Sequence, residues 1–279
     1  MKPPPFHYHR PDGLDEALAL LAEPGAVALA GGQDLVPLLN SRRIRPSTVV
    51  DLGAVEALRG ITGERDGIRL GALTRHRDVL DSVVVRDRLA LLHLAAGHIG
   101  HGAIRNRGTL GGSCASALPG AELPTALVAL GASMHLVSTG GRRSLPAATF
   151  FGGQGFGGQF LDGQPTALRQ GEVVEAVTVP VPRGGASWSF AEHTRRGAFK
   201  FPLISVAVLR TPGAVARIVV GGGAAGPITI EPDDPAGPRQ LADRLALADE
   251  PQAGRLYKAR IARSLIEQCW RSTEVTETP

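Results

Sequence analysis

The sequence has 279 residues, of which 43% are hydrophobic and 20% charged, so its composition is that of a folded protein with two or three domains. The formal net charge is +4, but Arg and Lys are dispersed among Asp and Glu and only 4% of the residues are aromatic, which argues against a nucleic-acid-binding protein. No run reaches the roughly 18 apolar residues that span a bilayer, and the first residues lack the apolar core of a secretory signal, so we expect no membrane insertion and a cytoplasmic location.

The first 60 residues combine one helical pattern with two strand patterns. An apolar helical pattern covers Leu14–Leu21, and short apolar runs of the strand type follow at Val27–Ala30 and Thr48–Leu52. A pair of glycines separates the first of these strands from a further apolar run, Leu35–Leu39. This order predicts a small α/β unit at the start of the chain.

The middle of the chain continues the alternation of strands and helices. Strands are expected at Ile68–Leu70 and Met134–Val137, and helices near His76–Leu80, Arg86–Gly97 and Leu123–Leu130. Thr74 stands where the cap of the first of these helices is expected, and Pro124 stands where a first-turn residue of the last is expected.

A glycine-rich stretch at 147–171 leads into the last third of the chain. Val173–Val179 is predicted to be a strand that ends at Pro180, and a domain boundary is expected near Glu175. Further strands are expected at Ser187–Glu192, Ile204–Leu209 and Ala216–Gly221, and a long helix from about Ala253 to Trp270. The last third is therefore interpreted as an α+β unit.

Two glycine-containing segments suit an anion such as a diphosphate. The first, Ala30–Leu35, joins a strand to an apolar run, and its adjacent glycines allow successive N–H groups to point at one anion. A pair of glycines on its own is more often only a tight turn. From the residues alone, both interpretations remain open.

The second segment, Thr109–Ser113, places glycines among small and hydroxyl-bearing side chains. The backbone can approach a bulky ligand closely there, while Thr109, Ser113 and Ser116 offer hydrogen bonds. Glu122 opens the next predicted helix, and its carboxylate suits either a ribose hydroxyl or the positive end of its own helix.

Other chemistries find little support. Gly153–Gly158 spells G-x-G-x-x-G, but more glycine, Asp162 and Pro165 follow instead of a helix, so a loop is expected. His98 and His101 lack a third ligand, and we expect no metal site. With two cysteines, the chain supplies neither a disulfide framework nor the four thiolates of an iron–sulfur cluster.

The first segment reads AGGQDLVP and the second IRNRGTLGGS, followed by LPGAE. GALTRH at 71–76, GEVVEAVTVP at 171–180, FPLISVAV at 201–208 and GGGAAGP at 221–227 add further landmarks. Together these stretches resemble the medium, FAD-binding subunit of the molybdenum hydroxylases, the family of xanthine dehydrogenase and carbon monoxide dehydrogenase. The likeness runs over nearly the whole chain.

The resemblance implies an α+β fold. It consists of a two-subdomain FAD-binding module of the vanillyl-alcohol-oxidase (PCMH) type and a C-terminal α+β domain with a small antiparallel sheet. The two subdomains would cover residues 1–58 and 59–175. The C-terminal domain, of the carbon monoxide dehydrogenase flavoprotein type, would cover residues 176–279.

By the same resemblance the two segments would hold the FAD pyrophosphate, chiefly through backbone N–H groups. Glu122 would bind the adenosine ribose, Ile99 would lie close to the flavin, and Leu203 would replace a lysine that contacts it in xanthine dehydrogenases. Asp34 replaces a small hydroxyl residue of the family, and we expect its side chain to cap the following helix. Leu118 likewise replaces a frequent Asp. The expected cofactor-binding residues are Ala30, Gly31, Gly32, Gln33, Asp34, Leu35, Ile99, Thr109, Leu110, Gly111, Gly112, Ser113, Ser116, Glu122 and Leu203.

The resemblance also implies a division of labour among chains. A small subunit with [2Fe-2S] clusters and a large subunit with molybdopterin would be the partners, in a dimer of heterotrimers. FAD would accept electrons from the clusters and pass them to an external acceptor, and no side chain of this subunit is expected to be catalytic. Two alternatives stay open: a self-contained FAD-dependent oxidoreductase of the same fold, and a non-enzymatic nucleotide-binding protein.

Overall fold

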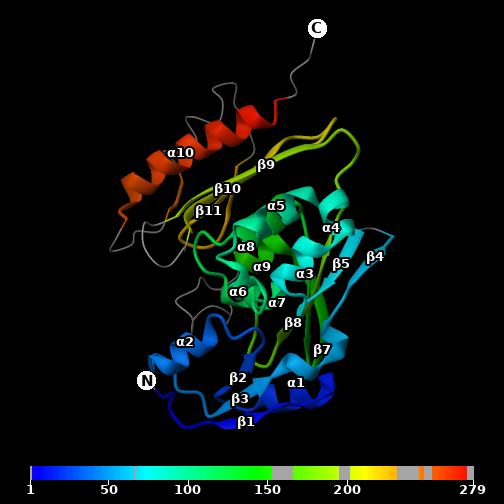
Figure 1. The fold of residues 1–279 in the computed structure, drawn as a ribbon, viewed down its shortest axis with the longest axis vertical. Helices are drawn as coiled ribbons and strands as arrows, with labels where there is room; N and C mark the ends of the chain where they lie inside the picture. The colour runs from blue at the N-terminus through cyan, green and yellow to red at the C-terminus, as the bar shows by residue number, and fades with distance from the viewer. Residues whose placement is uncertain are drawn as a thin grey trace.

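The computed structural model describes residues 2–65, 67–152, 166–194, 202–230, 245–247 and 253–274. Three sheets follow one another along the chain, from the blue N-terminal unit in Figure 1 to the red C-terminal helix. The mixture of helices and mainly antiparallel sheets confirms the expected α+β class. The glycine-rich run at 153–158, where a loop was predicted, lies outside the described residues.

The N-terminal unit is a parallel three-stranded sheet in the order β1-β3-β2. Its elements are β1 (His7–His9), α1 (Leu14–Ala22), β2 (Ala26–Leu29), α2 (Leu35–Asn40) and β3 (Thr48–Asp51). Helix α1 buries Ala17, Leu18 and Leu21 in a common core with β3, as the amphipathic spacing predicts. Since β2 runs into the segment Ala30–Leu35, that segment lies at the carboxyl edge of the sheet, where α/β sheets bind ligands.

The middle unit is an antiparallel five-stranded sheet in the order β4-β5-β8-β6-β7, with helices between its strands in the sequence. Two 3-10 helices, η1 (Leu52–Ala54) and η2 (Glu56–Leu58), lead into it. Its elements are β4 (Ile61–Glu64), β5 (Gly67–Gly71), α3 (His76–Asp81), α4 (Val83–Arg88), α5 (Ala90–His98), α6 (Gly102–Arg105), α7 (Leu110–Ser116), α8 (Glu122–Ala129), β6 (Ser133–Ser138), β7 (Gly141–Pro146), α9 (Ala147–Phe151) and β8 (Val173–Val179).

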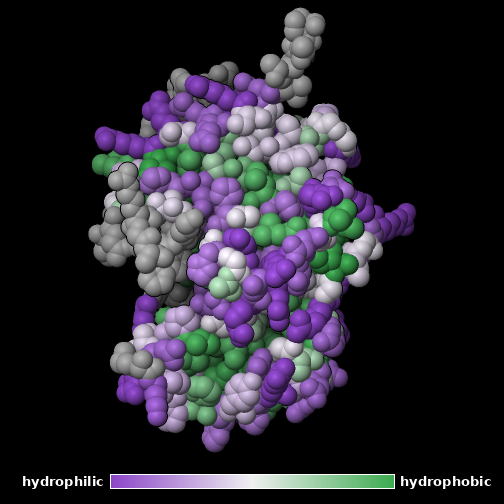
Figure 2. All heavy atoms as spheres, in the orientation of Figure 1, coloured by the Kyte–Doolittle hydropathy of each residue, from purple (hydrophilic) through white to green (hydrophobic). Residues whose placement is uncertain are grey.

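The C-terminal unit is an antiparallel sheet in the order β12-β11-β10-β9. It comprises β9 (Ser187–Thr194), β10 (Pro202–Arg210), β11 (Arg217–Gly221), β12 (Ile228–Ile230) and α10 (Arg255–Ser272). Figure 1 shows α10 on one side of this sheet and α5 and α8 on the other. Alternate residues of β10 therefore enter different cores, with Val206 and Val208 facing α10 and Ala207 facing the helices of the middle unit. Figure 2 shows largely hydrophilic side chains along the outer surface of α10.

The structure departs from the expected elements at two places. The single helix expected over Arg86–Gly97 is two helices, α4 and α5, separated at the buried Leu89. Thr74 does not cap α3, because Arg75 occupies the N-cap position and the Thr74 hydroxyl donates to the Gly60 carbonyl at 3.2 Å.

The expected boundary between residues 175 and 176 falls inside β8. This strand pairs with β5 through Gly71–Ala176 to Ile68–Val179, and with β6 on its other side. The expected boundary therefore divides a strand that is paired on both sides. None of the helices in the described parts of the chain is long and apolar enough to cross a lipid bilayer.

Candidate functional site

The two glycine segments are far apart in the sequence but touch in the structure. A β-carbon built on Gly31 would lie only 2.2 Å from the carbonyl oxygen of Arg107, so glycine is required for this close approach. The side chains of Asp34 and Ser116, which follow shortly after this contact, also interact, because Ser116 lowers the pKa of Asp34. The end of β2 in the N-terminal unit is thereby brought against the start of α7 in the middle unit.

The first segment offers a run of main-chain donors. Within the part of the chain that the structure describes, the N–H groups of residues 31–35 have no protein acceptor. Gly32 has a φ of +72°, the left-handed conformation that helps successive N–H groups to form an anion-binding concavity. The Gln33 side chain donates back to the Gly31 carbonyl at 3.3 Å. This arrangement fits a diphosphate, whose oxygens accept several hydrogen bonds at once.

The second segment is not a loop but the start of α7. Thr109 is the N-cap, and its side-chain oxygen accepts a hydrogen bond from the Gly112 N–H at 3.2 Å. The N–H groups of residues 110–113 all have acceptors within the protein, at 2.8–3.2 Å. These N–H groups are therefore already paired within the protein. The segment was expected to bind a ligand chiefly through them. Its partly exposed residues include Gly112 and Ser113, and a β-carbon built on Gly112 would lie 2.8 Å from Thr109 Oγ1.

Asp34 does not cap α2, so the prediction for its side chain is wrong. It occupies the N-cap position, but its side chain makes no cap hydrogen bond. Burial raises the pKa of Asp34, and the hydrogen bond with Ser116 offsets part of this rise. The carboxyl group interacts with Ser116, at the end of α7, and not with its own helix. The N–H groups of residues 31–35 are thus left without this side chain as an acceptor.

The apolar residues expected at the site are largely buried. Leu35 and Leu110 belong to hydrophobic cores, so their side chains are buried. Ile99, 9% exposed, ends α5. Leu203, 6% exposed, lies in β10 beside Gly120, where a β-carbon would come within 2.5 Å of the neighbouring Pro202 carbonyl oxygen. The main chain of β10 at residues 202–203 therefore packs against the turn that joins α7 to α8.

His76 is a buried histidine beneath the second segment, and sequence reasoning missed it as a site residue. Its ring nitrogen Nε2 lies 3.0 Å from Ser113 Oγ. Burial lowers the pKa of His76 to about 4, and the positive charge of Arg105 acts in the same direction. His76 is therefore neutral at physiological pH. The only sequence signal for it was its place at the end of the GALTRH stretch.

His76 is expected to make the apoprotein less stable as the pH falls. The unfolded chain binds a proton near pH 6.5, whereas the folded protein binds it near pH 4, so stability is lost across this window. The loss attributable to His76 is about 3 kcal/mol at pH 4. Urea unfolding of the wild type and His76→Gln at several pH values checks this. Equal pH dependence in the two proteins would contradict the prediction.

Glu122 lies in a second group of polar side chains, where α5, α8 and β9 meet. It is 7% exposed, and His98 of α5 and Glu192 of β9 act on it electrostatically. Burial raises the pKa of Glu122 to about 7, and the charge of Glu192 adds to the rise. His98 Nδ1 lies 3.5 Å from Glu192 Oε1, and this contact raises the pKa of His98. Glu192 was not anticipated as a neighbour of the site.

Glu122→Gln is expected to stabilise the apoprotein at alkaline pH. Since the folded-state pKa is raised, the wild type is most stable below pH 4.5 with respect to this group and loses stability as the pH rises through 7. Gln carries no such charge, and we expect a gain of about 1–3 kcal/mol at pH 8. Denaturant unfolding at pH 4 and pH 8 measures it; the gain should nearly vanish at pH 4.

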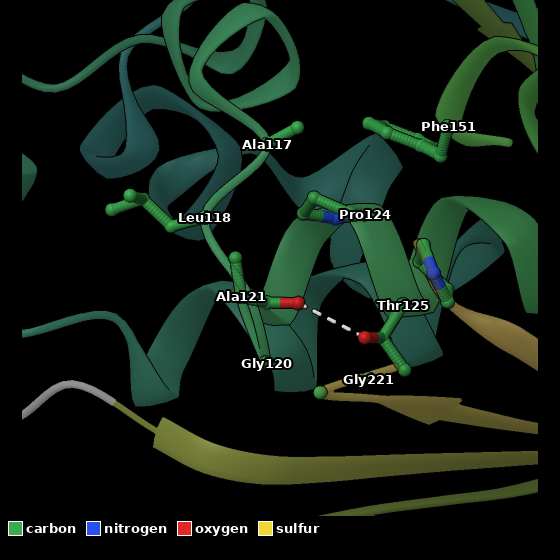
Figure 3. A pocket seen from close by; sticks show the side chains of 10 residues that line it. Ala117, Leu118, Gly120, Ala121, Pro124, Thr125, Phe151 and Gly221 are labelled. Carbon is green, nitrogen blue, oxygen red and sulfur yellow. Dashed lines mark hydrogen bonds between the residues drawn. The ribbon is translucent and has the colours of Figure 1, made fainter. Parts of the chain in front are cut away.

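Two hollows lie outside the contact between the segments. A cavity of 10 Å³, room for about one water molecule, lies where the turn at 117–121 meets β11 (Figure 3). The Thr125 hydroxyl, which donates to the Ala121 carbonyl at 2.9 Å, lines it. A groove of 280 Å³ at the amino ends of β2 and β3 is lined by residues 25–27, 43–46 and Gln170. The first is too small for a flavin ring, and the second lies at the edge of the sheet opposite to Ala30–Leu35.

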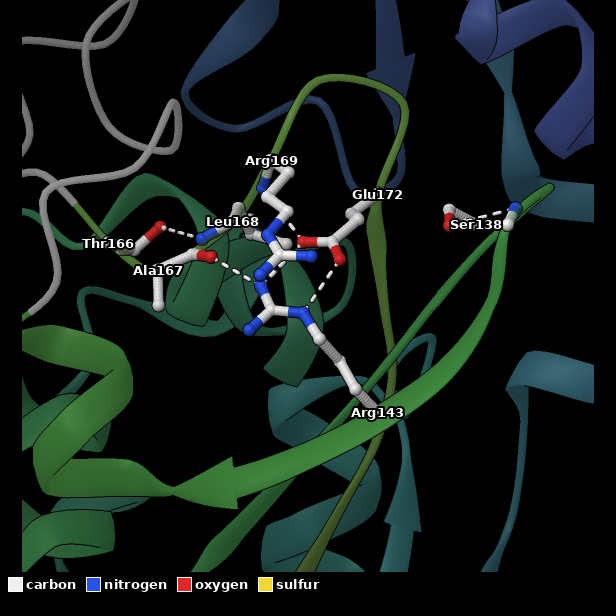
Figure 4. A network of polar contacts seen from close by, with 8 residues as sticks. Ser138, Arg143, Thr166, Ala167, Leu168, Arg169 and Glu172 are labelled. Atoms are coloured by element: carbon white, nitrogen blue, oxygen red, sulfur yellow. Dashed lines mark hydrogen bonds and ion pairs between the residues drawn. The ribbon is translucent and has the colours of Figure 1, made fainter.

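The loop beside the groove is held by one arginine (Figure 4). Arg143 Nε and Nη2 each donate to a carboxylate oxygen of Glu172 at 2.7 Å, and Nη2 also donates to the Ala167 carbonyl at 2.6 Å. Burial alone would raise the pKa of Glu172, but the hydrogen bonds from Arg143 and from the Arg169 N–H outweigh it, and the pKa is lowered. The network fixes the entry into β8 and has no part in the contact between the segments.

No group of three or more His, Cys, Asp or Glu side chains among the described residues is placed to hold a metal ion. Both cysteines are fully buried, and burial raises the pKa of each thiol.

Comparison with known proteins supplies the family of this chain. The family described as FAD binding domain in molybdopterin dehydrogenase matches residues 4–182. The 6-hydroxypseudooxynicotine dehydrogenase complex subunit alpha of Paenarthrobacter nicotinovorans is 40% identical over 70% of this chain and 64% of its own length. The carbon monoxide dehydrogenase medium chain of Hydrogenophaga pseudoflava is 36% identical over 70% of this chain and 66% of its own length. The match thus spans just under two thirds of these curated relatives.

Solved structures agree in fold over a longer stretch. A structure of carbon monoxide dehydrogenase from Hydrogenophaga pseudoflava matches with a TM-score of 0.87 and 29% identity, covering 98% of each chain. Quinoline 2-oxidoreductase from Pseudomonas putida 86 matches with a TM-score of 0.84 and 30% identity, covering 98% of this chain and 99% of that one.

Proposed function

Because the chain belongs to the family of FAD-binding domains of molybdopterin dehydrogenases, we propose that it is the FAD-carrying, electron-transferring subunit of a molybdenum hydroxylase. The membership confirms the family expected from the sequence. FAD supplies the redox chemistry when it is bound. The side chains and main chain of this subunit bind the cofactor, orient it and limit its contact with water.

One observation carries the proposal for the site: five successive N–H groups at 31–35 have no protein acceptor among the described residues, and their segment contacts residues 107 and 108, just before α7. A diphosphate between them would accept hydrogen bonds from the first segment and from the Ser113 hydroxyl of the second. Glu122 is proposed to bind the adenosine ribose, because a carboxyl group in that position can pair with ribose hydroxyls. Ile99 and Leu203 are proposed to border the flavin ring.

The proposed partners are an iron–sulfur subunit and a molybdopterin subunit, in a dimer of heterotrimers. The names of the relatives support a multi-subunit arrangement, since they are a complex subunit alpha and a medium chain. The two buried cysteines of this chain are too few for a cluster, so electrons would reach FAD from another chain. From FAD they would pass to an external acceptor.

The experiment is to purify the chain alone and together with its partner subunits. We expect a yellow protein that releases FAD on denaturation and turns over no substrate by itself. Complete reduction of its FAD by substrate should require the iron–sulfur and molybdopterin chains. Turnover by the isolated chain would favour the self-contained oxidoreductase, and a colourless protein that cannot be loaded with FAD would refute the proposal.

A further inference from the structure

Asp34 lies within the run of N–H groups that has no protein acceptor among the described residues. Of residues 31–35, Asp34 alone has an ionisable side chain. Covalent geometry keeps carboxyl oxygens within about 5 Å of the main-chain nitrogen of the same residue, whatever the rotamer. A diphosphate oxygen that accepts from the Asp34 N–H would therefore lie within about 8 Å of the carboxyl group. Salt screens a partly buried carboxylate only weakly at this distance, so an ionised Asp34 would repel the diphosphate.

The carboxyl group of Asp34 does not pair with its own helix. It makes no cap hydrogen bond with α2 and interacts instead with the Ser116 side chain at the end of α7. The Ser116 hydroxyl has a single hydrogen, which it also donates to the Ser113 carbonyl at 3.3 Å. A carbonyl and a carboxylate both accept, so they compete for this hydrogen. A protonated carboxyl group ends the competition, because it donates its own hydrogen to Ser116 Oγ.

Burial and Ser116 are what act on the Asp34 carboxyl in the described part of the chain, and burial favours its neutral form. Strand β2 and helix α2 carry no ionisable side chain. The loop before α7 contributes Arg107, whose side chain is exposed to solvent. Helix α7 contributes Cys114, whose thiol stays neutral because burial raises its pKa. Beneath α7, the ring of His76 is neutral above about pH 4.

We propose that FAD binds to the protein with Asp34 protonated, so that cofactor binding takes up a proton from the solvent at this carboxyl group. The inference rests on the proposed FAD-binding function and adds a protonation state to it. The diphosphate is a dianion, and it would take the N–H groups nearest to the carboxyl group. An ionised Asp34 would then be repelled and left without these donors. The pKa of Asp34 is already raised in the apoprotein, which makes this proton easier to take up.

The pH dependence of FAD binding tests the role of Asp34. The wild-type Kd should rise with pH by up to about tenfold per pH unit, beginning where Asp34 ionises in the apoprotein, above its usual 3.8. Asp34→Asn and Asp34→Ser cannot ionise and should lose this rise. At pH 8 both should bind FAD at least about tenfold more tightly than the wild type. FAD is the probe because its diphosphate keeps its charge over this range, whereas the terminal phosphate of ADP titrates.

Calorimetry in buffers with different ionisation enthalpies counts the protons directly. Over the pH range in which the wild-type Kd rises, the wild type should take up about one more proton per FAD than Asp34→Asn. This difference removes the contribution of Glu122, which titrates in the same range in both proteins. The matched control is Asp87→Asn, which removes an exposed carboxylate of α4 that lies 2.9 Å from Arg86. It should keep the wild-type pH dependence and proton count.

Two results would overturn the inference: the same pH dependence of Kd in the wild type and Asp34→Asn, or the same proton uptake in both. If the wild type binds FAD at no pH, the proposed function itself fails. The two failures are therefore distinguishable.

Discussion

Gly112→Asp is expected to abolish retention of FAD while leaving the apoprotein folded. Gly112 is in the first turn of α7, and an aspartate there would add both bulk and a negative charge next to the proposed diphosphate. Like charges about 4 Å apart near a protein surface repel by a few kcal/mol, so the Kd of FAD should rise at least about a hundredfold. The ratio of flavin to protein absorbance after desalting measures the loss.

Two other substitutions at the same position separate bulk from charge. Asparagine has nearly the shape of aspartate without its charge, and Gly112→Asn should weaken FAD binding much less. Gly112→Ala adds a β-carbon that meets only the Thr109 Oγ1 oxygen, at 2.8 Å, and should cost less still. Helix α7 itself should tolerate aspartate, because the position is in its first turn, where a negative charge is favourable. Full flavin content in Gly112→Asp would show that the diphosphate does not bind beside Gly112.

The periodic parts of the fold could be predicted because their residues carry a local pattern. Helix α1 follows from the spacing of Ala17, Leu18 and Leu21, and the strand β10 from an apolar run that reflects burial on both faces. The contact that makes the site could not be predicted in this way. Nothing local to Gly31 indicates that a carbonyl group 76 positions later lies against it, and the resemblance to a family was needed to pair the two segments.

The features that could not be predicted from the sequence are short or depend on the tertiary structure. Helix α7 was not expected, because its residues Gly111 and Gly112 are poor helix formers. The side chain of Thr109 caps its first turn and helps it to form. The break between α4 and α5 falls at Leu89, whose side chain is fully buried and gives no turn signal. Asp34 was assigned to its own helix by a local rule, whereas its partner, Ser116, comes from a distant segment. For Asp34, a contact from elsewhere in the chain overrides the local preference.

Gly31→Ala is expected to disturb both the fold and the cofactor site, because Gly31 lies at the contact between the two segments. The new β-carbon would lie 2.2 Å from the Arg107 carbonyl oxygen and 2.9 Å from the Gly108 α-carbon, all backbone atoms that cannot turn away. Forcing the segments apart should cost the apoprotein about 1–3 kcal/mol and weaken FAD binding at least about tenfold.

The matched control for Gly31→Ala is Gly102→Ala, at the first residue of α6. No atom lies within 4 Å of a β-carbon built there, and its φ is not in the left-handed region. Urea unfolding and FAD titration should show little change in this variant, since it adds the same methyl group without a clash. If Gly31→Ala matched Gly102→Ala in both measurements, the two segments would be looser than the structure has them. The contact between the segments would then form only when FAD binds. A methyl group at Gly31 destabilises the apoprotein only if this contact already exists without FAD.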